Sequence, residues 1–255
     1  MVERQEGLAV RDLERRTTPQ DDAMVSLILA TFNERDNILH TIENIFRYVP
    51  EPVEVIVVDD DSPDQTWKLV GDLNDPRVKL IRRVATRGLA SAFMRGIIES
   101  RGEIVGWLDA DMCMPPEILP QMLEKLRDYD VVIGSRYVEG GQDRRHALRV
   151  YASRLINAFA GFVLGYGIKD YDSGFVLLRR SVFDKALPIP IGYGEYFIEF
   201  IYVCCRKGFK VCEVPYTFTD RAKGVSKSFP SLWRFFVLGT KYGLRILQAR
   251  CRRIT

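Results

Sequence analysis

The chain of 255 residues lacks the sequence features that mark several common classes of protein. It contains neither a Gly-x-Gly-x-x-Gly fingerprint nor a Walker loop, which argues against an ordinary dinucleotide or ATP site. Its five cysteines show neither zinc nor thioredoxin spacing, so we expect reduced thiols in a cytosolic compartment. Residues 1–22 have no apolar core, so they predict a polar arm rather than a signal peptide.

Long apolar runs are scarce as well. The longest nearly apolar stretch, residues 155–168, is too short for a spanning helix, so we expect no transmembrane helix. Charge is uneven along the chain, because residues 221–255 hold nine of the 37 Lys and Arg and none of the 34 Asp and Glu. The other 28 basic and 34 acidic residues give residues 1–220 a balance of −6, so a slightly acidic body carries a basic tail.

The chain does contain a regular alternation of apolar runs and helical patterns. Strands are predicted at residues 24–30, 53–58, 78–81, 104–109 and 131–133. Helices are predicted at residues 37–48, 66–73, 90–99 and 117–126. Strands that alternate with helices at this spacing predict an α/β fold, with a Rossmann-like, mostly parallel sheet and helices on both faces.

Two carboxylates, Asp109 and Asp111, follow directly on a buried apolar run. Ligands of open α/β sheets bind outside the carboxyl ends of such strands. Carboxylates placed side by side there repel each other, and the usual remedy is a hard divalent cation held by oxygen ligands. We therefore predict that this pair holds Mg²⁺ or Mn²⁺ on a diphosphate; two solvated loop acids are the alternative.

Polar residues also follow the first two predicted strands. Glu34 and Asp60 should lie at the same sheet edge as the carboxylate pair, where they can accept hydrogen bonds from a ribose hydroxyl or a base N–H. Other polar side chains of these loops are of the types that helix starts need, and we favour a structural capping role for Ser62, Asp64 and Thr66.

Several further motifs occur in a fixed order along the chain. They are Ala30-Thr31-Phe32-Asn33-Glu34, Val58 through Thr66, Arg87-Gly88-Leu89-Ala90-Ser91-Ala92, Asp109-Ala110-Asp111, Gly134-Ser135-Arg136-Tyr137, Asp170 with Ser173-Gly174-Phe175, Glu199, Glu213-Val214-Pro215, Asp220-Arg221 and Gly224-Val225-Ser226-Lys227. Each is weak alone, but the ordered set resembles the family 2 inverting glycosyltransferases, and within them the dolichol-phosphate mannose synthase group, over residues 24–229.

The resemblance implies a GT-A type fold, GDP-mannose as donor and dolichyl or another polyprenyl phosphate as acceptor. It divides the chain into the polar arm (1–22), a catalytic domain (23–228) and a basic amphipathic helix (229–255). Donor binding is implied for Ala30, Phe32, Glu34, Asp60, Asp109, Arg221 and Lys227. Contact with the acceptor phosphate is implied for Ser135, Arg136 and Arg149. The catalytic residues implied are Asp111 and Arg136, and the metal ligands Asp109 and Asp111.

Four residues depart from the family pattern. Ala30 replaces a proline, and Phe32 replaces a tyrosine but keeps a stacking face. Cys113 stands where relatives often place glutamine, and a thiol is a softer ligand that suits magnesium or manganese less well. Asp172 stands where relatives carry Thr or Val, and an extra acid near an anionic acceptor has no explanation at this stage.

The chemistry implied by the resemblance needs no catalytic base. A lipid phosphate is already an anion at neutral pH, whereas a hydroxyl acceptor would need a general base. What the phosphate needs is positive charge that holds it against the donor's own negative charge. The residues expected to supply this charge are Arg136, Arg149, Arg221 and Lys227.

The basic tail bears on the lipid hypothesis separately. At 100° per residue, one narrow helical face collects Arg234, Lys241, Arg245, Gln248 and Arg252. Trp, Phe and Leu lie mostly on other faces, so we expect a helix at a membrane interface, with residues 149–164 as a second such helix. The alternative is a helix packed on the catalytic domain. We expect a peripheral enzyme on the cytoplasmic face of a membrane, docked by these helices or through a small membrane-protein partner, with no nucleic-acid role.

Other functions stay open at this point. UDP-glucose or another nucleotide sugar could serve as donor to the same acceptor. A soluble enzyme that acts on a glycan hydroxyl would need a working base near Asp111, such as Asp172. A catalytically silent nucleotide-sugar sensor or membrane scaffold is compatible with the departures from the family pattern.

Overall fold

The computed structural model describes residues 23–219 and 232–252, and of residues 232–238 it describes the backbone alone. The predicted polar arm, Arg221 and Lys227 lie outside the described residues.

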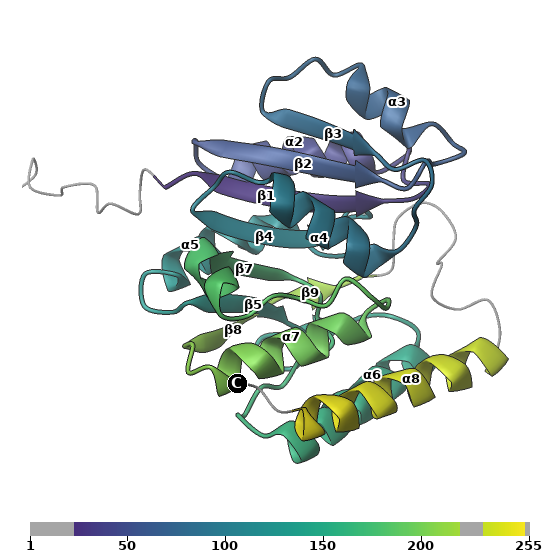
Figure 1. Ribbon diagram of the computed structural model, residues 1–255, viewed down its shortest axis with the longest axis vertical. Helices are drawn as coiled ribbons and strands as arrows, with labels where there is room; N and C mark the ends of the chain where they lie inside the picture. The colour runs from purple at the N-terminus through teal and green to yellow at the C-terminus, as the bar shows by residue number, and fades with distance from the viewer. Residues whose placement is uncertain (1–22, 220–231, 253–255) are drawn as a thin grey trace, which may run out of the picture.

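A seven-stranded sheet in the order β3-β2-β1-β4-β7-β5-β8 forms the centre of the molecule (Figure 1). Neighbouring strands are parallel except at β7, which runs antiparallel to both β4 and β5. The predicted mostly parallel α/β sheet is therefore confirmed. The strands are β1 (Val25–Thr31), β2 (Val53–Asp59), β3 (Val78–Arg82), β4 (Ile104–Asp109), β5 (Val131–Ser135), β7 (Val176–Arg179) and β8 (Val211–Pro215).

Helices cover both faces of this sheet, as predicted, because successive side chains of a strand point to opposite faces. In β1, Ile28 packs into a core with α4 and α7, whereas Leu27 and Leu29 pack into a second core with α2, α3 and α5. The helices are α2 (Ile38–Tyr48), α3 (Thr66–Gly71), α4 (Leu89–Glu99), α5 (Leu119–Lys125), α6 (Ala147–Leu164), α7 (Glu195–Arg206) and α8 (Leu232–Cys251). Short 3₁₀ helices lie at Pro116–Ile118 and Arg180–Asp184, and β6 (Gln142–Asp143) pairs with β9 (Thr217–Phe218).

The antiparallel strand β7 depends on a glycine in its neighbour β4. A Cβ on Gly106 would lie 2.2 Å from Cδ2 of Leu177 and 2.5 Å from the carbonyl oxygen of Val176. Both distances are far below van der Waals contact, so only glycine lets β7 approach β4 this closely. The close approach places β7 in the centre of the sheet, between β4 and β5.

At the end of the molecule away from α3, α6 and α8 lie side by side (Figure 1). The face of α8 that is buried carries Tyr242, Ile246 and Ala249. Leu244 and Leu247 point outward and are 59% and 47% exposed. Helix α8 is therefore amphipathic, with one apolar row packed on the protein and a second one exposed.

The basic face predicted for this helix is divided between protein and solvent. Arg245 and Arg252 pair with the buried Glu199 of α7, at N–O distances of 3.2 and 2.5 Å. Lys241 and Gln248 are exposed. Among the described side chains, two members of this face thus hold the helix on the catalytic domain, as in the alternative of a helix packed on that domain, while Lys241 and Gln248 face solvent.

By length and composition alone, α6 qualifies as a membrane-spanning helix, with 18 residues, a mean hydropathy of 1.2 and 22% of its residues buried. This finding differs from the expectation of no such helix, because the helix begins before the apolar stretch that the sequence analysis considered. An α-helix of this length reaches about 27 Å, close to the lower limit for crossing a bilayer core.

Candidate active site

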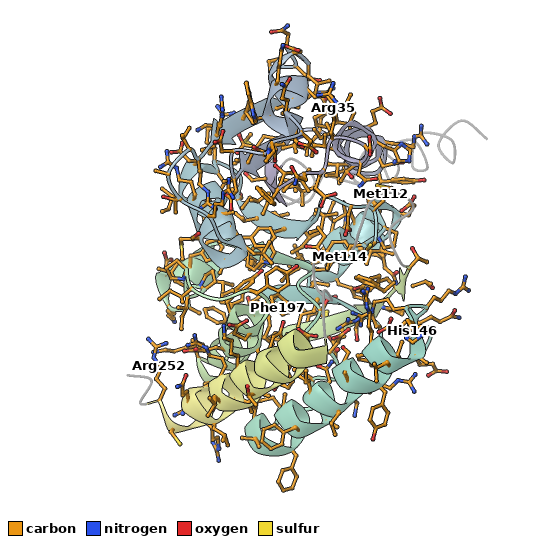
Figure 2. The ribbon with its side chains drawn as sticks, turned by 90° about the vertical axis from the view of Figure 1, so that its right-hand side faces the viewer. Arg35, Met112, Met114, His146, Phe197 and Arg252 are labelled. Atoms are coloured by element: carbon orange, nitrogen blue, oxygen red, sulfur yellow. The ribbon has the colours of Figure 1, made fainter. Side chains whose placement is uncertain are left out.

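A cavity of about 1130 Å³ opens at the carboxyl ends of β1, β2 and β4 and continues between α4, α6 and α8. Figure 2 shows Met112, in the loop after β4, and His146, at the start of α6, on the same side of the molecule. The predicted site residues that line the cavity are Ala30, Phe32, Glu34, Asp60, Asp109, Asp111, Arg136 and Arg149. The structure therefore brings together residues separated by more than a hundred positions in the sequence.

The loop after β4 presents the carboxylate pair. Met112 has a left-handed φ of 63°, which turns the chain sharply after Asp111. Oδ1 of Asp111 accepts a hydrogen bond from the backbone N–H of Cys113 at 3.1 Å. The hydroxyl of Thr41 in α2 donates to the carbonyl oxygen of Ala110 at 3.0 Å, which fixes the loop against the protein body.

The donor set of this loop fits a divalent cation shared with a substrate. Among the described residues, no group of three or more His, Cys, Asp and Glu side chains could hold a metal by itself. Mg²⁺ is commonly bound by one or two carboxylates together with phosphate oxygens and water, rather than by an all-protein cage. Asp109 and Asp111 supply such a pair, and both line the cavity.

Asp60 is held in a fixed orientation at the carboxyl end of β2. Its Oδ2 accepts the backbone N–H of Gly88 at 2.8 Å, and its Oδ1 accepts Nε of Arg83 at 2.6 Å. Nη1 of Arg83 also donates to the hydroxyl of Ser91 in α4, at 2.9 Å. Arg83 belongs to none of the sequence motifs, although it directly follows β3, so the rule about the carboxyl ends of strands applies to it as well.

Glu34 and Phe32 lie in the loop after β1, next to the loop that carries Asp60, and line the same cavity. Oε2 of Glu34 accepts a hydrogen bond from the side-chain amide of Asn37 at 3.1 Å. The guanidinium carbon of Arg87 lies 4.8 Å from the centre of the Phe32 ring, a cation–π contact. An aromatic face and a guanidinium group therefore meet where the resemblance implies a nucleoside.

The neighbouring polar residues Ser62, Asp64 and Thr66, for which a capping role was predicted, form hydrogen bonds within and between the β1 and β2 loops. Oδ1 of Asp64 accepts the backbone N–H of Thr66 at 2.9 Å and its hydroxyl at 2.6 Å. The hydroxyl of Ser62 donates to Asp59 at 2.6 Å and accepts the backbone N–H of Asn33 at 3.0 Å. The bond from Asn33 to Ser62 joins the β1 and β2 loops, so these residues have a structural role. The N-cap of α3 is Gln65, however, and its side chain forms no capping hydrogen bond, so the predicted capping is not what these residues do.

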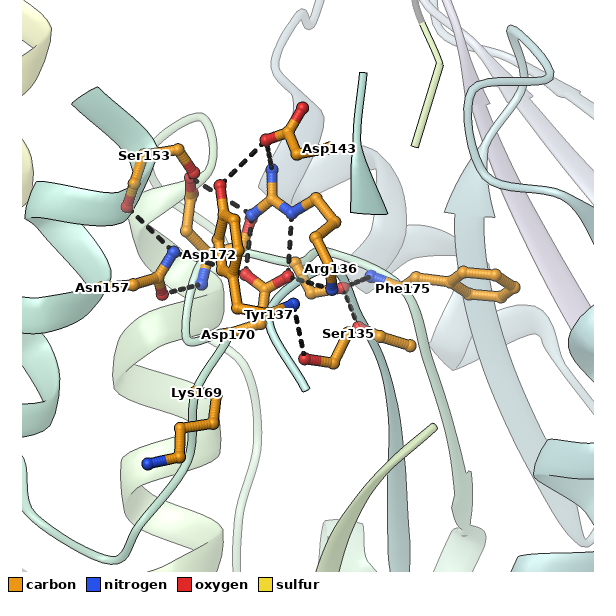
Figure 3. Close-up of polar contacts among 12 residues, drawn as sticks. Ser135, Arg136, Tyr137, Asp143, Ser153, Asn157, Lys169, Asp170, Asp172 and Phe175 are labelled. Carbon is orange, nitrogen blue, oxygen red and sulfur yellow. Dashed lines mark hydrogen bonds and ion pairs between the residues drawn. The ribbon is translucent and has the colours of Figure 1, made fainter. Parts of the chain in front are cut away.

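Arg136, which follows β5, forms a buried bidentate ion pair with Asp170 (Figure 3). Its Nε lies 2.8 Å from Oδ2 and its Nη2 lies 2.6 Å from Oδ1, and the two side chains are 2% and 0% exposed. Burial lowers the pKa of Arg136, but the Asp170 carboxylate outweighs burial and holds the pKa well above its ordinary value. Arg136 is therefore a permanent, rigidly held cation in the wall of the cavity.

A second ion pair, which the sequence analysis missed, supports the first. Asp143 in β6 accepts Nε and Nη2 of Arg145 at 2.8 and 2.6 Å, and the Tyr137 hydroxyl at 2.8 Å. Burial raises the pKa of Asp143, but hydrogen bonds from Arg145 and Tyr137 and the charge of Arg136 bring it below the ordinary value. Arg145 also lines the cavity, and no motif marked it in the sequence.

Of the residues predicted to meet an acceptor phosphate, Arg149 lies in the first turn of α6 and lines the cavity. Ser135 does not line it: the residue is fully buried in β5, and its hydroxyl hydrogen-bonds Glu213 in β8. The structure therefore places Arg136 and Arg149 in the wall of one cavity, whereas Ser135 is buried and does not reach it.

Asp172, the unexplained acid, lines the cavity next to Arg136. Its backbone carbonyl accepts Nη2 of Arg136 at 2.9 Å, and its carboxylate hydrogen-bonds the hydroxyl of Tyr242 in α8. Burial raises the pKa of Asp172 to about 6, with Asp170 adding to the increase and Arg136 opposing it. This residue therefore connects α8 to the Arg136–Asp170 pair.

Beyond these charged groups the cavity wall becomes apolar. The side chains that line this part come from α4, α6, α7 and α8, and they are Leu89, Phe93, Leu155, Ile156, Phe159, Tyr196 and Ile246. One continuous cavity thus joins a carboxylate pair, a cluster of arginines and an apolar channel.

Residues 26–187 match the Glycosyl transferase family 2 domain. The chain therefore belongs to glycosyl transferase family 2 and is a glycosyltransferase, as the ordered motifs indicated.

Curated relatives extend the comparison. The chain is 38% identical over 216 residues to a dolichol-phosphate mannosyltransferase of Pyrococcus furiosus, covering 80% of this chain and 58% of the relative. It therefore spans little more than half the length of that relative. It is 36% identical over 211 residues to a polyprenol monophosphomannose synthase of Mycolicibacterium smegmatis, covering 79% of each chain.

A solved structure of glucosyl-3-phosphoglycerate synthase from Mycobacterium tuberculosis, in complex with Mn²⁺ and UDP, has a TM-score of 0.68 and 19% sequence identity. The match covers 90% of this chain and 80% of that chain. At this identity the likeness concerns the fold, and the predicted GT-A type fold is confirmed.

Proposed function

We propose that this chain transfers mannose from GDP-mannose to dolichyl or another polyprenyl phosphate, with Mg²⁺ or Mn²⁺ as the cofactor. The observation that carries the proposal is the single cavity that is lined by a carboxylate pair, a cluster of arginines and a set of apolar side chains. A nucleotide sugar and a lipid phosphate together need these three environments. The names of the two curated relatives support the same reaction class.

On the donor side, Glu34 and Asp60 would bind the nucleoside. Asp109 and Asp111 would hold a divalent cation, which when bound would supply positive charge for the departing diphosphate. Phe32, with Arg87 over its ring, offers a flat surface beside which a base can stack. The replacement of tyrosine by Phe32 leaves this surface intact. Arg221 and Lys227, outside the described residues, remain predicted contacts of the donor.

On the acceptor side, Arg136 and Arg149 would bind the lipid phosphate, with Arg145 as a further cation. The phosphate oxygen is already ionised, so attack on the sugar carbon requires no proton transfer. The ion pair with Asp170 fixes the Arg136 guanidinium before the phosphate arrives, so little reorganisation is needed during transfer. Arg136 therefore acts by holding and orienting the nucleophile.

The membrane side of the enzyme would be the exposed apolar surface of α6 and α8. Its members are Tyr151, Leu155, Phe159, Phe162, Leu244 and Leu247, of which Phe162 is 87% exposed. An apolar surface of this kind, next to the basic residues of α8, favours peripheral docking on an anionic leaflet. The cytoplasmic face is the side where nucleotide sugars would be available, and a small membrane protein is a further candidate partner.

The proposal is tested by incubating the purified chain with radiolabelled GDP-mannose, Mn²⁺ and polyprenyl phosphate in liposomes. We expect label in the lipid phase. A parallel reaction with UDP-glucose tests the donor, because label from that donor alone would keep the mechanism and change the sugar. Absence of lipid label from either donor, despite binding of the nucleotide, would refute transfer to a polyprenyl phosphate.

A further inference from the structure

Asp172 is the carboxylate in this region that a guanidinium group holds least closely. Arg136 is committed to Asp170 by two short hydrogen bonds, and Arg145 is committed to Asp143 in the same way. By contrast, Oδ2 of Asp172 lies 3.8 Å from Nη2 of Arg136 and 3.4 Å from the hydroxyl of Ser153. Asp172 therefore places a weakly compensated negative charge in the cavity wall.

The charged and titratable groups around this carboxylate come from every element packed against it. Arg136 follows β5, Arg145 follows β6, and Asp170 precedes Asp172 in its own loop. Helix α8 contributes the hydroxyl of Tyr242, which itself lies near Glu195 and Tyr193. The polar groups of α6 on this side are Arg149, Ser153 and Asn157.

An anionic acceptor that binds Arg136 and Arg149 must lie beside Asp172, because all three line the same part of the cavity. Two anionic groups in contact in a largely buried site repel each other, and one shared proton relieves the repulsion, so such a pair titrates jointly. A phosphate monoester has a second pKa near 6, so it can share a proton with a carboxyl group of similar acidity.

We propose that the acceptor phosphate binds beside Arg136 together with one proton from solvent, and that Asp172 and the phosphate share this proton. The inference rests on the proposed function, since it describes the acceptor end of the same site. The shared proton turns a repulsive contact into a hydrogen bond. It also makes acceptor binding weaker as the pH rises, by about tenfold per pH unit once both free partners are ionised.

The first test counts protons directly. Farnesyl phosphate is titrated into the full chain at pH 8 in two buffers of different ionisation enthalpy, and the difference in heat gives the protons taken up. We expect about one proton per bound ligand for the natural chain and close to none for Asp172→Asn. Zero uptake by the natural chain would overturn the proposal, and so would equal uptake by the variant.

The second test follows KM for farnesyl phosphate between pH 7 and 8.5. We expect KM to rise about tenfold per unit for the natural chain and to stay nearly constant for Asp172→Asn. Asp184→Asn is the matched control, since it makes the same change on an exposed acid and should behave as the natural chain does. Parallel slopes for Asp172→Asn and the natural chain would refute the role of the carboxylate.

A third variant separates the carboxylate from its contact with α8. Tyr242→Phe removes the hydroxyl and leaves the carboxylate, so we expect proton uptake to persist. Loss of proton uptake in Tyr242→Phe would mean that the uptake depends on how α8 packs on the protein and not on the carboxylate, and it would overturn the proposal. Uptake without sugar transfer would refute the proposed function alone, and transfer without uptake would refute this inference alone.

Discussion

The ion pair between Arg136 and Asp170 is expected to stabilise the fold as well as the site. Asp170→Asn keeps the size of the side chain but removes its charge, and it leaves the guanidinium in a pocket where it is only 2% exposed. Nη2 keeps its hydrogen bond to the backbone carbonyl of Asp172 at 2.9 Å, and the nearest other carboxylates are those of Asp172, 3.8 Å from Nη2, and Asp143, 4.0 Å from Nη1. Breaking a buried pair by removing one partner costs about 3–5 kcal/mol. Because asparagine retains one acceptor oxygen, we expect a loss of about 3 kcal/mol.

The assay is urea denaturation of the natural chain and the variant, followed by the fluorescence of the buried Trp107 and by far-ultraviolet circular dichroism. Glu51→Gln is the control, because its ion pair with Arg77 is exposed and should leave the unfolding midpoint unchanged. If Asp170→Asn lowers the free energy of unfolding by less than about 1 kcal/mol, with an unchanged denaturant slope, the buried charge of Arg136 does not depend on Asp170 and the reasoning is refuted.

Three further substitutions test the fold and its charges. Burial raises the pKa of Glu54, but hydrogen bonds from Ser26 and Arg101 outweigh burial and lower it, so the ionised carboxylate stabilises the fold. Glu54→Gln should therefore destabilise the protein by about 2 kcal/mol at pH 7. In acid-dependent unfolding, the difference between the variant and the natural chain should vanish as the pH falls below about 4. Gly106→Ala should destabilise by more than about 2 kcal/mol in urea, because the new methyl group overlaps Leu177 and a backbone carbonyl that cannot move; a change near zero would contradict the β4–β7 register. Asp172→Asn should raise the free energy of unfolding at pH 8 by up to about 3 kcal/mol, because a pKa raised from 3.8 to about 6 means that the ionised carboxylate destabilises the folded state. At pH 4 the carboxyl group of the folded protein is protonated, so the free energy of unfolding should stay unchanged. Equal effects at both pH values would contradict the burial of this charge.

The strands β1, β2 and β4 could be predicted because each is a mostly apolar run bounded by polar residues. The strand β7 could not, since its four residues carry no periodic signal and its direction depends on pairing with β4 and β5. Gly106 gave no indication of this pairing in the sequence, because its role appears only when the side chain of Leu177 is placed against it.

The position of the site followed from a general rule about strand ends, and this rule located Glu34, Asp60, Asp109 and Asp111 correctly in one cavity. Partners within the site could not be read in the same way. Arg136 and Asp170 are separated by 34 positions, and only the fold brings them into contact. A carboxylate or guanidinium group in a sequence shows its charge but not which opposite charge has already neutralised it.

The same limit explains the interpretation of the C-terminal helix. Helical periodicity placed Arg245 and Arg252 on one face correctly, but it could not reveal that Glu199 of α7 lies opposite that face. The exposed row, which contains Leu244 and Leu247, then becomes the better candidate for contact with a membrane. An amphipathic pattern fixes which residues share a face, whereas the neighbouring elements decide which face is covered.

The most direct test of the central claim is sugar transfer by the natural chain and by Asp111→Asn, measured with radiolabelled GDP-mannose, polyprenyl phosphate and Mn²⁺ in the same liposomes. The account predicts lipid-phase label from the natural chain and a loss of at least a hundredfold, about 2.7 kcal/mol, in the variant, with an unchanged circular dichroism spectrum. Equal transfer by both proteins would contradict the role of the carboxylate pair, and no transfer by the natural chain would contradict the proposed reaction.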